Sequence, residues 1–359
     1  YYPQGPLFAH VIGYVGRINE SEMRNIDPSL YRGTDFIGKL GIEKYYESAL
    51  LGKLGHEHVE TNARGRVMRS LGKEDPIPGA NLRLYLDANL QRTAQEVLRD
   101  RRAAFVAIEI KTGGILAMVS TPSYDPNKFV LGISQTDYSE LVKSKNQPLF
   151  NRAIRGQYPP GSTFKMMVGL AALETGVITS KTKSFCSGHV EIGDMKFHCW
   201  HKHGHGAVDL LDAIAQSCDV FFYEIALKTG INNIAKISRE FGLGLPTGIN
   251  LPGEKSGLIP DRKWKLDVKK QVWRPGETII AGIGQGYVLA TPIQLALMTA
   301  RIANGGKKIN PTYDDYAESG HIEAVKIFYR PSLISFSSLL EIFSKAHDKI
   351  PTCLPMSST

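Results

Sequence analysis

Two residues near the middle of the chain, Ser162 and Lys165, have the types and the spacing of a nucleophile and its base. The prolines and the glycine at positions 159–161 predict a helix start here, and the apolar residues that follow predict a helix through Leu173. Side chains three positions apart share one helical face, so the hydroxyl and the amine should lie together. A serine hydroxyl is a weak nucleophile, and an adjacent amine can activate it by removing its proton. The alternative is a helix-capping serine beside a solvated lysine.

A second polar motif, Ser217-Cys218-Asp219, stands between an amphipathic segment, 210–215, and an aromatic one, 221–223. With both motifs present, the sequence resembles the superfamily of penicillin-binding proteins and serine β-lactamases, which carries Ser-x-x-Lys, Ser-Asp-Asn and Lys-Thr-Gly motifs. More narrowly, it is similar to the class B penicillin-binding proteins of the penicillin-binding protein 2 type, the peptidoglycan D,D-transpeptidases of bacterial cell elongation. Asp219 favours this type, because the cell-division relative usually has asparagine there.

The resemblance extends over residues 1–306 and does not depend on one motif. Further segments that are similar to family signatures lie on both sides of Ser162, at residues 36–47, 62–67, 120–127, 282–287 and 290–294.

The resemblance also implies a mechanism and a role for each polar residue. Ser162, deprotonated by Lys165, would attack the carbonyl of the penultimate D-alanine of a peptidoglycan stem peptide and form an acyl-enzyme. Ser217 would relay a proton to the leaving nitrogen, and Asp219 would orient the lysine and the substrate amide. An amine from a neighbouring stem peptide would complete the crosslink. β-Lactam antibiotics would be trapped on the same serine.

The expected fold is α+β, with an antiparallel sheet and helices in a penicillin-binding transpeptidase domain. Residues 1–76 predict an elongated N-terminal pedestal module with extended pieces such as residues 10–16, and residues 77–306 predict the transpeptidase domain. Within that domain we expect a strand over 82–86, a helix over 88–102 and a hairpin formed by 105–110 and 115–120.

Two Lys-Thr-Gly sequences are expected to be structural, not catalytic. Lys111-Thr112-Gly113 closes the predicted hairpin, where glycine provides the positive φ of a tight turn. Lys228-Thr229-Gly230 ends a predicted helix, where lysine complements the helix dipole and glycine supplies the cap.

The family's third motif, Lys-Thr-Gly or Lys-Ser-Gly, is expected after Gly286 on a core strand beyond a helix over 292–303, and it is missing. The domain is therefore expected to be incomplete at its C-terminus. Residues 307–359 read as an atypical tail that arose by a frameshift, a misassembled reading frame or a truncation. In the family the third strand supplies one oxyanion donor, and losing such a donor costs about a hundred- to a thousandfold in rate. We therefore expect this chain to be impaired or inactive.

Three cysteines and one histidine, Cys186, Cys199, His205 and Cys218, could form a metal site. Thiolates and an imidazole suit tetrahedral structural zinc. Some members of the penicillin-binding protein 2 family are similar in this segment, with a zinc ligand at the position of Cys218. A Cys186–Cys199 disulfide and an unliganded histidine loop are the alternatives, although three cysteines leave one unpaired. We expect structural zinc, and no cofactor for catalysis.

Composition bounds the partners and the location. The 359 residues are 42% hydrophobic with a net charge of +8 and a pI near 9.1, which suits work beside anionic lipids and acidic wall polymers. No nucleic-acid motif is present, so nucleic acid is not an expected partner. No apolar run reaches the length of a membrane span. The chain starts at Tyr1 without methionine, and the resemblance implies a membrane helix upstream of it, with the protein on the periplasmic face of the bacterial inner membrane.

The expected partners are stem peptides, lipid-linked precursors, β-lactam antibiotics, and the glycosyltransferase and scaffold proteins of the elongation complex. Three other functions stay open at this point. They are a serine β-lactamase, a cell-division transpeptidase, and a non-catalytic scaffold that binds the elongation glycosyltransferase through residues 1–76.

Overall fold

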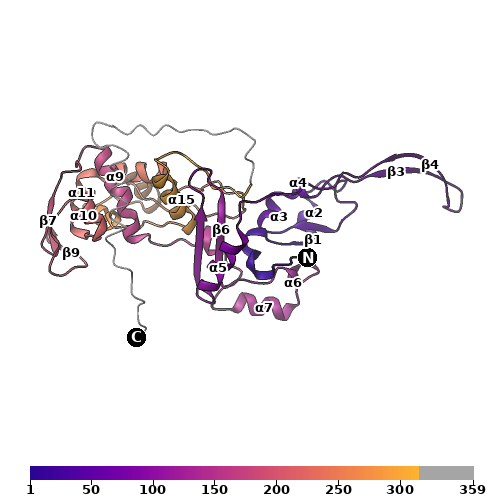
Figure 1. Ribbon diagram of the computed structural model, residues 1–359, viewed down its shortest axis with the longest axis horizontal. Coiled ribbons are helices and arrows are strands. Elements are labelled where there is room, and N and C mark those ends of the chain that lie inside the picture. Colours follow the sequence, from indigo (N-terminus) through magenta and orange to yellow (C-terminus); the bar gives the residue numbers. More distant parts are fainter. Residues whose placement is uncertain (315–359) are drawn as a thin grey trace.

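The structure is a computed structural model, and it describes residues 1–314. Of the predicted tail, 307–359, the residues after Asp314 lie outside the described residues. The structure therefore does not describe the region in which a strand with the third motif was expected. The described chain is elongated, with helices α9, α10 and α11 toward one end and the β3–β4 hairpin at the other (Figure 1). Among residues 1–314, no helix is long and apolar enough to cross a membrane.

The N-terminal module begins with short elements. They are η1 (Gly5–Leu7), α1 (Ala9–Ile12), β1 (Val15–Arg17), α2 (Glu20–Met23), β2 (Phe36–Gly38), α3 (Gly41–Tyr45) and α4 (Glu47–Leu50). The strand predicted over residues 10–16 is wrong in its first half, because α1 occupies it. Gly13 ends this helix with a φ of 76°, and a Cβ there would lie 1.9 Å from the carbonyl oxygen of Leu40. Only glycine permits this turn and this close approach.

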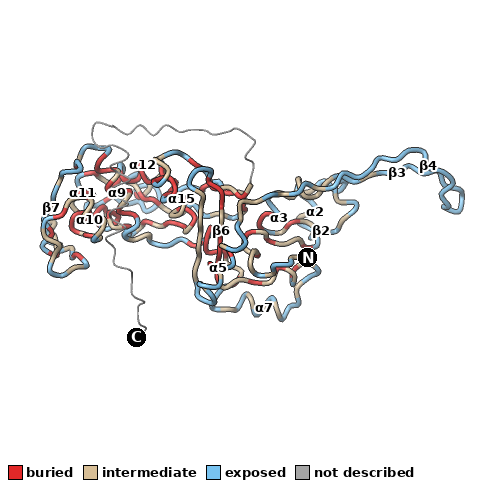
Figure 2. The backbone as a smooth tube through the Cα atoms, viewed as in Figure 1, coloured by how far each residue is buried: buried red, intermediate tan, exposed pale blue. Residues whose placement is uncertain are grey.

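Strands β3 (His56–Thr61) and β4 (Val67–Glu74) pair antiparallel in a hairpin that projects from the module (Figure 1). Every residue of both strands is exposed (Figure 2), including Val67, Met68 and Leu71, each more than 60% exposed. A two-stranded hairpin that buries no side chain gains little stability from its own packing.

One apolar cluster joins the N-terminal module to the rest of the chain. Val11 of α1 and Ile42 of α3 pack with Ile115 and Met118 of β6 (Ile115–Thr121). β6 pairs antiparallel with β5 (Ala103–Ile108), which confirms the predicted hairpin and places the Lys111–Gly113 sequence at its turn. The predicted helix is α5 (Ala88–Leu98), which stops before residue 102 because Arg99 adopts a φ of 49°.

Residues 82–86 do not form the predicted strand. Leu84 makes a single antiparallel bridge with Asp314, and the Tyr85 N–H donates to the carbonyl of Tyr313. Tyr313 is completely buried. Just before it, the carbonyl of Thr312 accepts a hydrogen bond from the Ile115 N–H. The packed fold therefore continues through Asp314, past the domain end predicted at residue 306.

The rest of the described chain, beyond β6, contains the remaining elements. They are α6 (Asn127–Val130), α7 (Gln135–Lys143), α8 (Arg152–Arg155), η2 (Gly161–Phe164), α9 (Lys165–Glu174), α10 (Leu210–Ala215), α11 (Asp219–Thr229), α12 (Ile231–Glu240), α13 (Arg262–Trp264), the π-helical turn η3 (Lys265–Lys269), α14 (Pro275–Gly282) and α15 (Pro292–Ala303). Four short strands complete it: β7 (Ser184–Cys186) pairs with β10 (Gly206–Val208), and β8 (His189–Ile192) pairs with β9 (Met195–His198).

Helices α9 and α11 form the centre of the larger hydrophobic core. Met167 and Val168 of α9 and Phe221 and Phe222 of α11 are all at most 1% exposed. A helix that is apolar on nearly all sides must be buried on nearly all sides, and α9 meets that condition (Figure 2). The described helices and antiparallel strand pairs confirm the predicted α+β class.

Candidate active site

The turn that presents Ser162 is held by backbone contacts. Ser162 lies in η2, immediately before α9, and is exposed, whereas Phe164 and Lys165 behind it are at most 1% exposed. The Gly161 N–H donates to the carbonyl of Gly284, and a Cβ on Gly284 would come within 2.2 Å of the Gly161 carbonyl oxygen. Glycine at position 284 therefore lets a neighbouring loop support the turn that carries the serine.

The second motif forms the corner between α10 and α11. Ser217 has a φ of 52°, a left-handed conformation that costs free energy in any residue with a Cβ. The N–H groups of Ser217 and Cys218 donate back to carbonyls of α10, which stabilises the corner. Asp219 is the first residue of α11, where the helix dipole favours a carboxylate.

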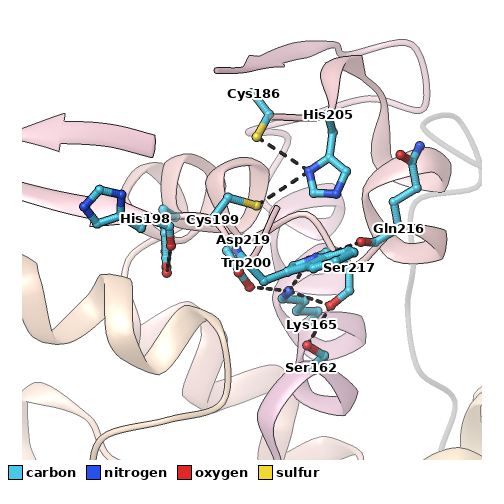
Figure 3. A network of polar contacts seen from close by, with 11 residues as sticks. Ser162, Lys165, Cys186, His198, Cys199, Trp200, His205, Gln216, Ser217 and Asp219 are labelled. Carbon is cyan, nitrogen blue, oxygen red and sulfur yellow. Dashed lines mark hydrogen bonds and ion pairs between the residues drawn. The ribbon is translucent and has the colours of Figure 1, made fainter. Parts of the chain in front are cut away.

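The structure brings all four predicted polar residues together (Figure 3). The Oγ atoms of Ser162 and Ser217 are 2.7 Å apart. The Lys165 Nζ donates to the Ser217 Oγ and to the Ser217 carbonyl, both at 2.9 Å, and to the Asp219 Oδ1 at 2.7 Å. These bonds form one continuous path from the exposed hydroxyl of Ser162 to the carboxylate of Asp219.

Lys165 is 1% exposed, which contradicts the alternative of a solvated lysine beside a capping serine. A buried lysine amino group needs polar partners, and here these are Asp219 and Ser217, with the ring centroid of Phe222 5.5 Å from the Nζ. The three hydrogen bonds that Lys165 donates go to Ser217 and Asp219. The link from Lys165 to Ser162 therefore passes through the Ser217 hydroxyl.

Trp200 is part of this site and was not predicted from the sequence. Its backbone N–H donates to the Asp219 Oδ2 at 3.0 Å, and its indole N–H is shared by the carbonyls of Gln216, at 3.1 Å, and Ser217, at 3.0 Å (Figure 3). The only feature of the sequence that pointed to Trp200 was its position next to Cys199. Sequence motifs rarely identify a tryptophan whose role is to donate hydrogen bonds to main-chain carbonyls.

The predicted metal ligands also come together. One ligand atom from each of Cys186, Cys199, His205 and Cys218 lies within 4.8 Å of all the others. The His205 Nδ1 is 3.6 Å from the Cys186 Sγ and 3.5 Å from the Cys199 Sγ (Figure 3). In a tetrahedral zinc site with ordinary Zn–S and Zn–N bonds, a sulfur ligand and a nitrogen ligand lie about 3.6 Å apart.

Burial changes the protonation of two residues of the cluster. Burial lowers the pKa of His205, which favours the neutral imidazole that coordinates metals. Burial also raises the pKa of the Cys218 thiol well above its usual range, so a bound cation would be needed to hold the thiolate there. The three cysteines are free, and the structure does not form the alternative Cys186–Cys199 disulfide.

The second Lys-Thr-Gly sequence is structural, as predicted. It ends α11, and Gly230 follows with a φ of 79°, a conformation that glycine adopts without strain.

An exposed serine on a buried Ser-x-x-Lys helix, facing a Ser-x-Asp corner, is the arrangement of the superfamily of penicillin-binding proteins and serine β-lactamases. Residues 103–327 match the family described as "Penicillin binding protein transpeptidase domain", and residues 1–84 match "Penicillin-binding Protein dimerisation domain". The chain therefore belongs to the penicillin-binding transpeptidases, within the penicillin-binding protein 2 family.

Curated relatives carry the name peptidoglycan D,D-transpeptidase MrdA. The chain is 49% identical over 313 residues to that of Acinetobacter baumannii, covering 87% of this chain and 47% of the relative. It is 46% identical over 312 residues to that of Escherichia coli K12, covering 85% and 49%. The chain thus spans about half the length of the curated relatives it matches.

Solved structures are also similar over almost the whole chain. Pseudomonas aeruginosa PBP2 in complex with WCK 5153 superposes with a TM-score of 0.86 at 44% identity, covering 96% of this chain and 72% of that one. The complex between PBP2 and MreC from Helicobacter pylori gives a TM-score of 0.88 at 36% identity, covering 97% and 64%.

Proposed function

We propose that this chain carries the catalytic serine of a peptidoglycan D,D-transpeptidase. The observation that supports this most directly is the continuous hydrogen-bonded path from Ser162 through Ser217 to Lys165 and Asp219. An exposed hydroxyl connected to a buried amine is one arrangement that activates a serine as a nucleophile. Relatives named as D,D-transpeptidases support the same reaction class.

The reaction begins at Ser162, whose Oγ attacks the carbonyl of the penultimate D-alanine of a stem peptide. Its proton passes along the 2.7 Å contact to the Ser217 hydroxyl, which in turn transfers a proton to the Lys165 amine. Lys165 then returns its proton through the Ser217 hydroxyl to the leaving nitrogen, so that Ser217 ends as a neutral hydroxyl and D-alanine departs from the acyl-enzyme. An amine of a second stem peptide displaces Ser162 and forms the crosslink.

The negative oxygen that forms during this attack needs hydrogen-bond donors. Ser162 lies at the N-terminal end of the helical segment that continues as α9, so its own N–H and the helix dipole favour an oxyanion there. In the family the second donor comes from the third motif, whose expected position lies beyond the described residues.

Labelling with a fluorescent penicillin tests this function. The folded chain should form a stable adduct that mass mapping assigns to Ser162, and Ser162→Ala should abolish it. Ser256→Ala, at an exposed serine, is the control and should be labelled at the parental rate. Labelling that persists in Ser162→Ala would contradict the assignment, and rapid turnover of nitrocefin would indicate a β-lactamase instead. The rate also tests the predicted impairment, since efficient acylation would contradict it.

We also propose that Cys186, Cys199, His205 and Cys218 hold a structural zinc ion. Support comes from the donor types, from the short distances between them and from the burial of the three cysteines. Zinc would brace the second motif, because Cys218 stands between Ser217 and Asp219. It would take no part in the chemistry.

Elemental analysis of the purified chain should find about one zinc per molecule. Cys186→Ser should lose the ion and lower the thermal midpoint of unfolding, because Cys186 is 1% exposed and lies on β7, away from the second motif in sequence. Full zinc occupancy in Cys186→Ser, or a disulfide between Cys186 and Cys199 in mass mapping, would contradict the site.

We further propose that the chain works on the periplasmic face of the inner membrane, in complex with a glycosyltransferase and scaffold proteins. A PBP2 of the same family is known in a complex with MreC, and a further similar structure belongs to a peptidoglycan synthase complex. The β3–β4 hairpin, with Val67, Met68 and Leu71 exposed, is suited to such contacts. The double variant with Met68→Lys and Leu71→Lys should bind the glycosyltransferase or scaffold partner more weakly than the parent in a pull-down. Its labelling by penicillin should be unchanged.

A further inference from the structure

Trp200 combines exposure with tight anchoring. Its side chain is 61% exposed, yet two hydrogen bonds attach the residue to the second motif and a third attaches it to the carbonyl of Gln216, just before that motif. A large exposed aromatic side chain would normally retain rotational freedom. Here the indole N–H and the backbone N–H both point to the same corner of the structure, so the residue is fixed against it (Figure 3).

Trp200 and Lys165 use the same two acceptors. The Ser217 carbonyl accepts from the Lys165 Nζ at 2.9 Å and from the Trp200 indole at 3.0 Å. The Asp219 carboxylate accepts from Lys165 at Oδ1, at 2.7 Å, and from the Trp200 backbone at Oδ2, at 3.0 Å. Every acceptor that anchors Lys165, other than the Ser217 hydroxyl, is therefore also anchored by Trp200.

This sharing has a mechanical consequence for the base. A carboxylate held on one oxygen can rotate, whereas Asp219 is held on both, so its Oδ1 stays directed at Lys165. The Ser217 carbonyl belongs to a residue at a φ of 52°, and two donors on it oppose relaxation of that strained corner. Displacement of either acceptor would move the Lys165 Nζ relative to the Ser217 Oγ, from which it is 2.9 Å.

Trp200 also contacts the cysteine–histidine cluster. It follows Cys199 directly in the chain, and its ring centroid lies 5.5 Å from that of His205. The cluster thus reaches the second motif by two routes, within the motif through Cys218 and across the loop through Trp200.

We propose that Trp200 is a positioning residue that fixes Lys165 indirectly, through the Ser217 carbonyl and the Asp219 carboxylate, and transmits the order of the cysteine–histidine cluster to the reacting hydroxyls. The proposal rests on the transpeptidase function proposed above. Trp200 needs no contact with substrate to act in this way. Its replacement should therefore lower the rate of acylation and leave the affinity for the β-lactam unchanged.

The test compares the full chain with Trp200→Phe, which keeps an aromatic ring and the backbone N–H but removes the indole donor. Acylation by a fluorescent penicillin is followed at increasing concentration to separate the limiting acylation rate from the apparent dissociation constant. The limiting rate should fall about two- to tenfold, the loss expected for one hydrogen bond, with the dissociation constant unchanged. Trp264→Phe, the same change at a tryptophan that packs edge-on against Tyr287, is the control and should match the parent.

A second readout does not depend on catalysis. Acetic anhydride modifies accessible lysines, and mass mapping gives the extent of modification at Lys165. Trp200→Phe should raise modification of Lys165 about two- to tenfold over the parent, by the same hydrogen-bond argument, and leave Lys263, which is exposed, unchanged. If the parent chain is not acylated at all, the proposed function fails while this measurement still decides the role of Trp200.

The outcomes separate positioning from other roles. Replacement of Trp200 by 3-benzothienylalanine, which keeps the ring shape without the N–H, should reproduce the effect of phenylalanine. Restoration of the parental rate by that residue would overturn the proposal, because packing alone would then explain the effect. A higher dissociation constant at an unchanged limiting rate would also overturn it, since it would make the indole a binding surface for the ligand.

Discussion

At the scale of single residues, the central fact is that Ser217 lies between Ser162 and Lys165, the proposed nucleophile and base. Its Oγ is 2.7 Å from the Oγ of Ser162 and 2.9 Å from the Nζ of Lys165. The sequence suggested that Lys165 deprotonates Ser162 directly. The geometry indicates a shared proton path, in which one hydroxyl serves both the attack and the departure of the leaving group.

Removal of that hydroxyl should therefore slow acylation strongly. Ser217→Ala breaks the path from Ser162 to Lys165 but keeps the Ser217 carbonyl, which still anchors the lysine. We expect penicillin acylation to fall by about a hundred- to ten-thousandfold, the usual contribution of general acid–base catalysis. Stopped-flow labelling measures the rate, and circular dichroism checks the fold. A loss of less than about threefold would show that protons reach Lys165 by another route.

Some of these residues were predictable, for a physical reason. Ser162 and Lys165 share a helical turn, so their proximity follows from spacing alone. Ser217 and Asp219 could be placed in the same site only by resemblance, because no local rule brings them to α9. Trp200 could not be found from the sequence. It donates hydrogen bonds from its indole N–H and its backbone N–H, and two of the acceptors are main-chain carbonyls. Contacts to the main chain produce no recognisable pattern of side-chain types.

At the scale of elements, one helix begins and ends where it was predicted. Helix α15 begins after Thr291 with a capping box closed by Gln294, and it spans the predicted residues 292–303. Helix α1 was missed, because a single turn has no periodicity to recognise. Its position depends instead on tertiary contacts, chiefly those of Val11 and His10 at the junction between the two halves.

His10 makes this junction sensitive to pH. Burial, with a smaller contribution from the positive charge of Arg152, lowers the pKa of His10 from its ordinary 6.5 to about 4. The folded chain therefore favours neutral histidine. Its stability is complete above pH 6.5, falls as the pH drops toward 4 and then levels off. The total loss from this group is about 3 kcal/mol.

Chemical denaturation at pH 7 and at pH 4 measures this effect. The difference in unfolding free energy between the two pH values should be about 3 kcal/mol smaller in His10→Gln than in the parent. His56→Gln, on the exposed strand β3, is the matched control and should keep the parental difference. An unchanged pH dependence in His10→Gln would mean that this histidine is not buried in its neutral form.

At the scale of the whole molecule, the first and the last described segments meet in one apolar cluster. Val11 and Ile42, from the N-terminal module, pack in the same cluster as Tyr313, near the end of the described chain. The sequence predicted separate units divided near residue 76 and a fold that ends at 306. It could not indicate this junction, because contacts between distant segments leave no periodic pattern.

Tyr313 tests whether the junction stabilises both halves. The residue is completely buried, and its hydroxyl donates to the Met118 Sδ at 3.2 Å. Tyr313→Ala would leave a large cavity, so we expect a loss of about 3–5 kcal/mol in unfolding free energy and one cooperative transition at a lower temperature. Calorimetry measures both. Tyr138→Ala, at a residue 49% exposed on α7, should cost under about 0.5 kcal/mol. Two separate transitions in Tyr313→Ala, with one at the parental temperature, would show that the halves fold independently.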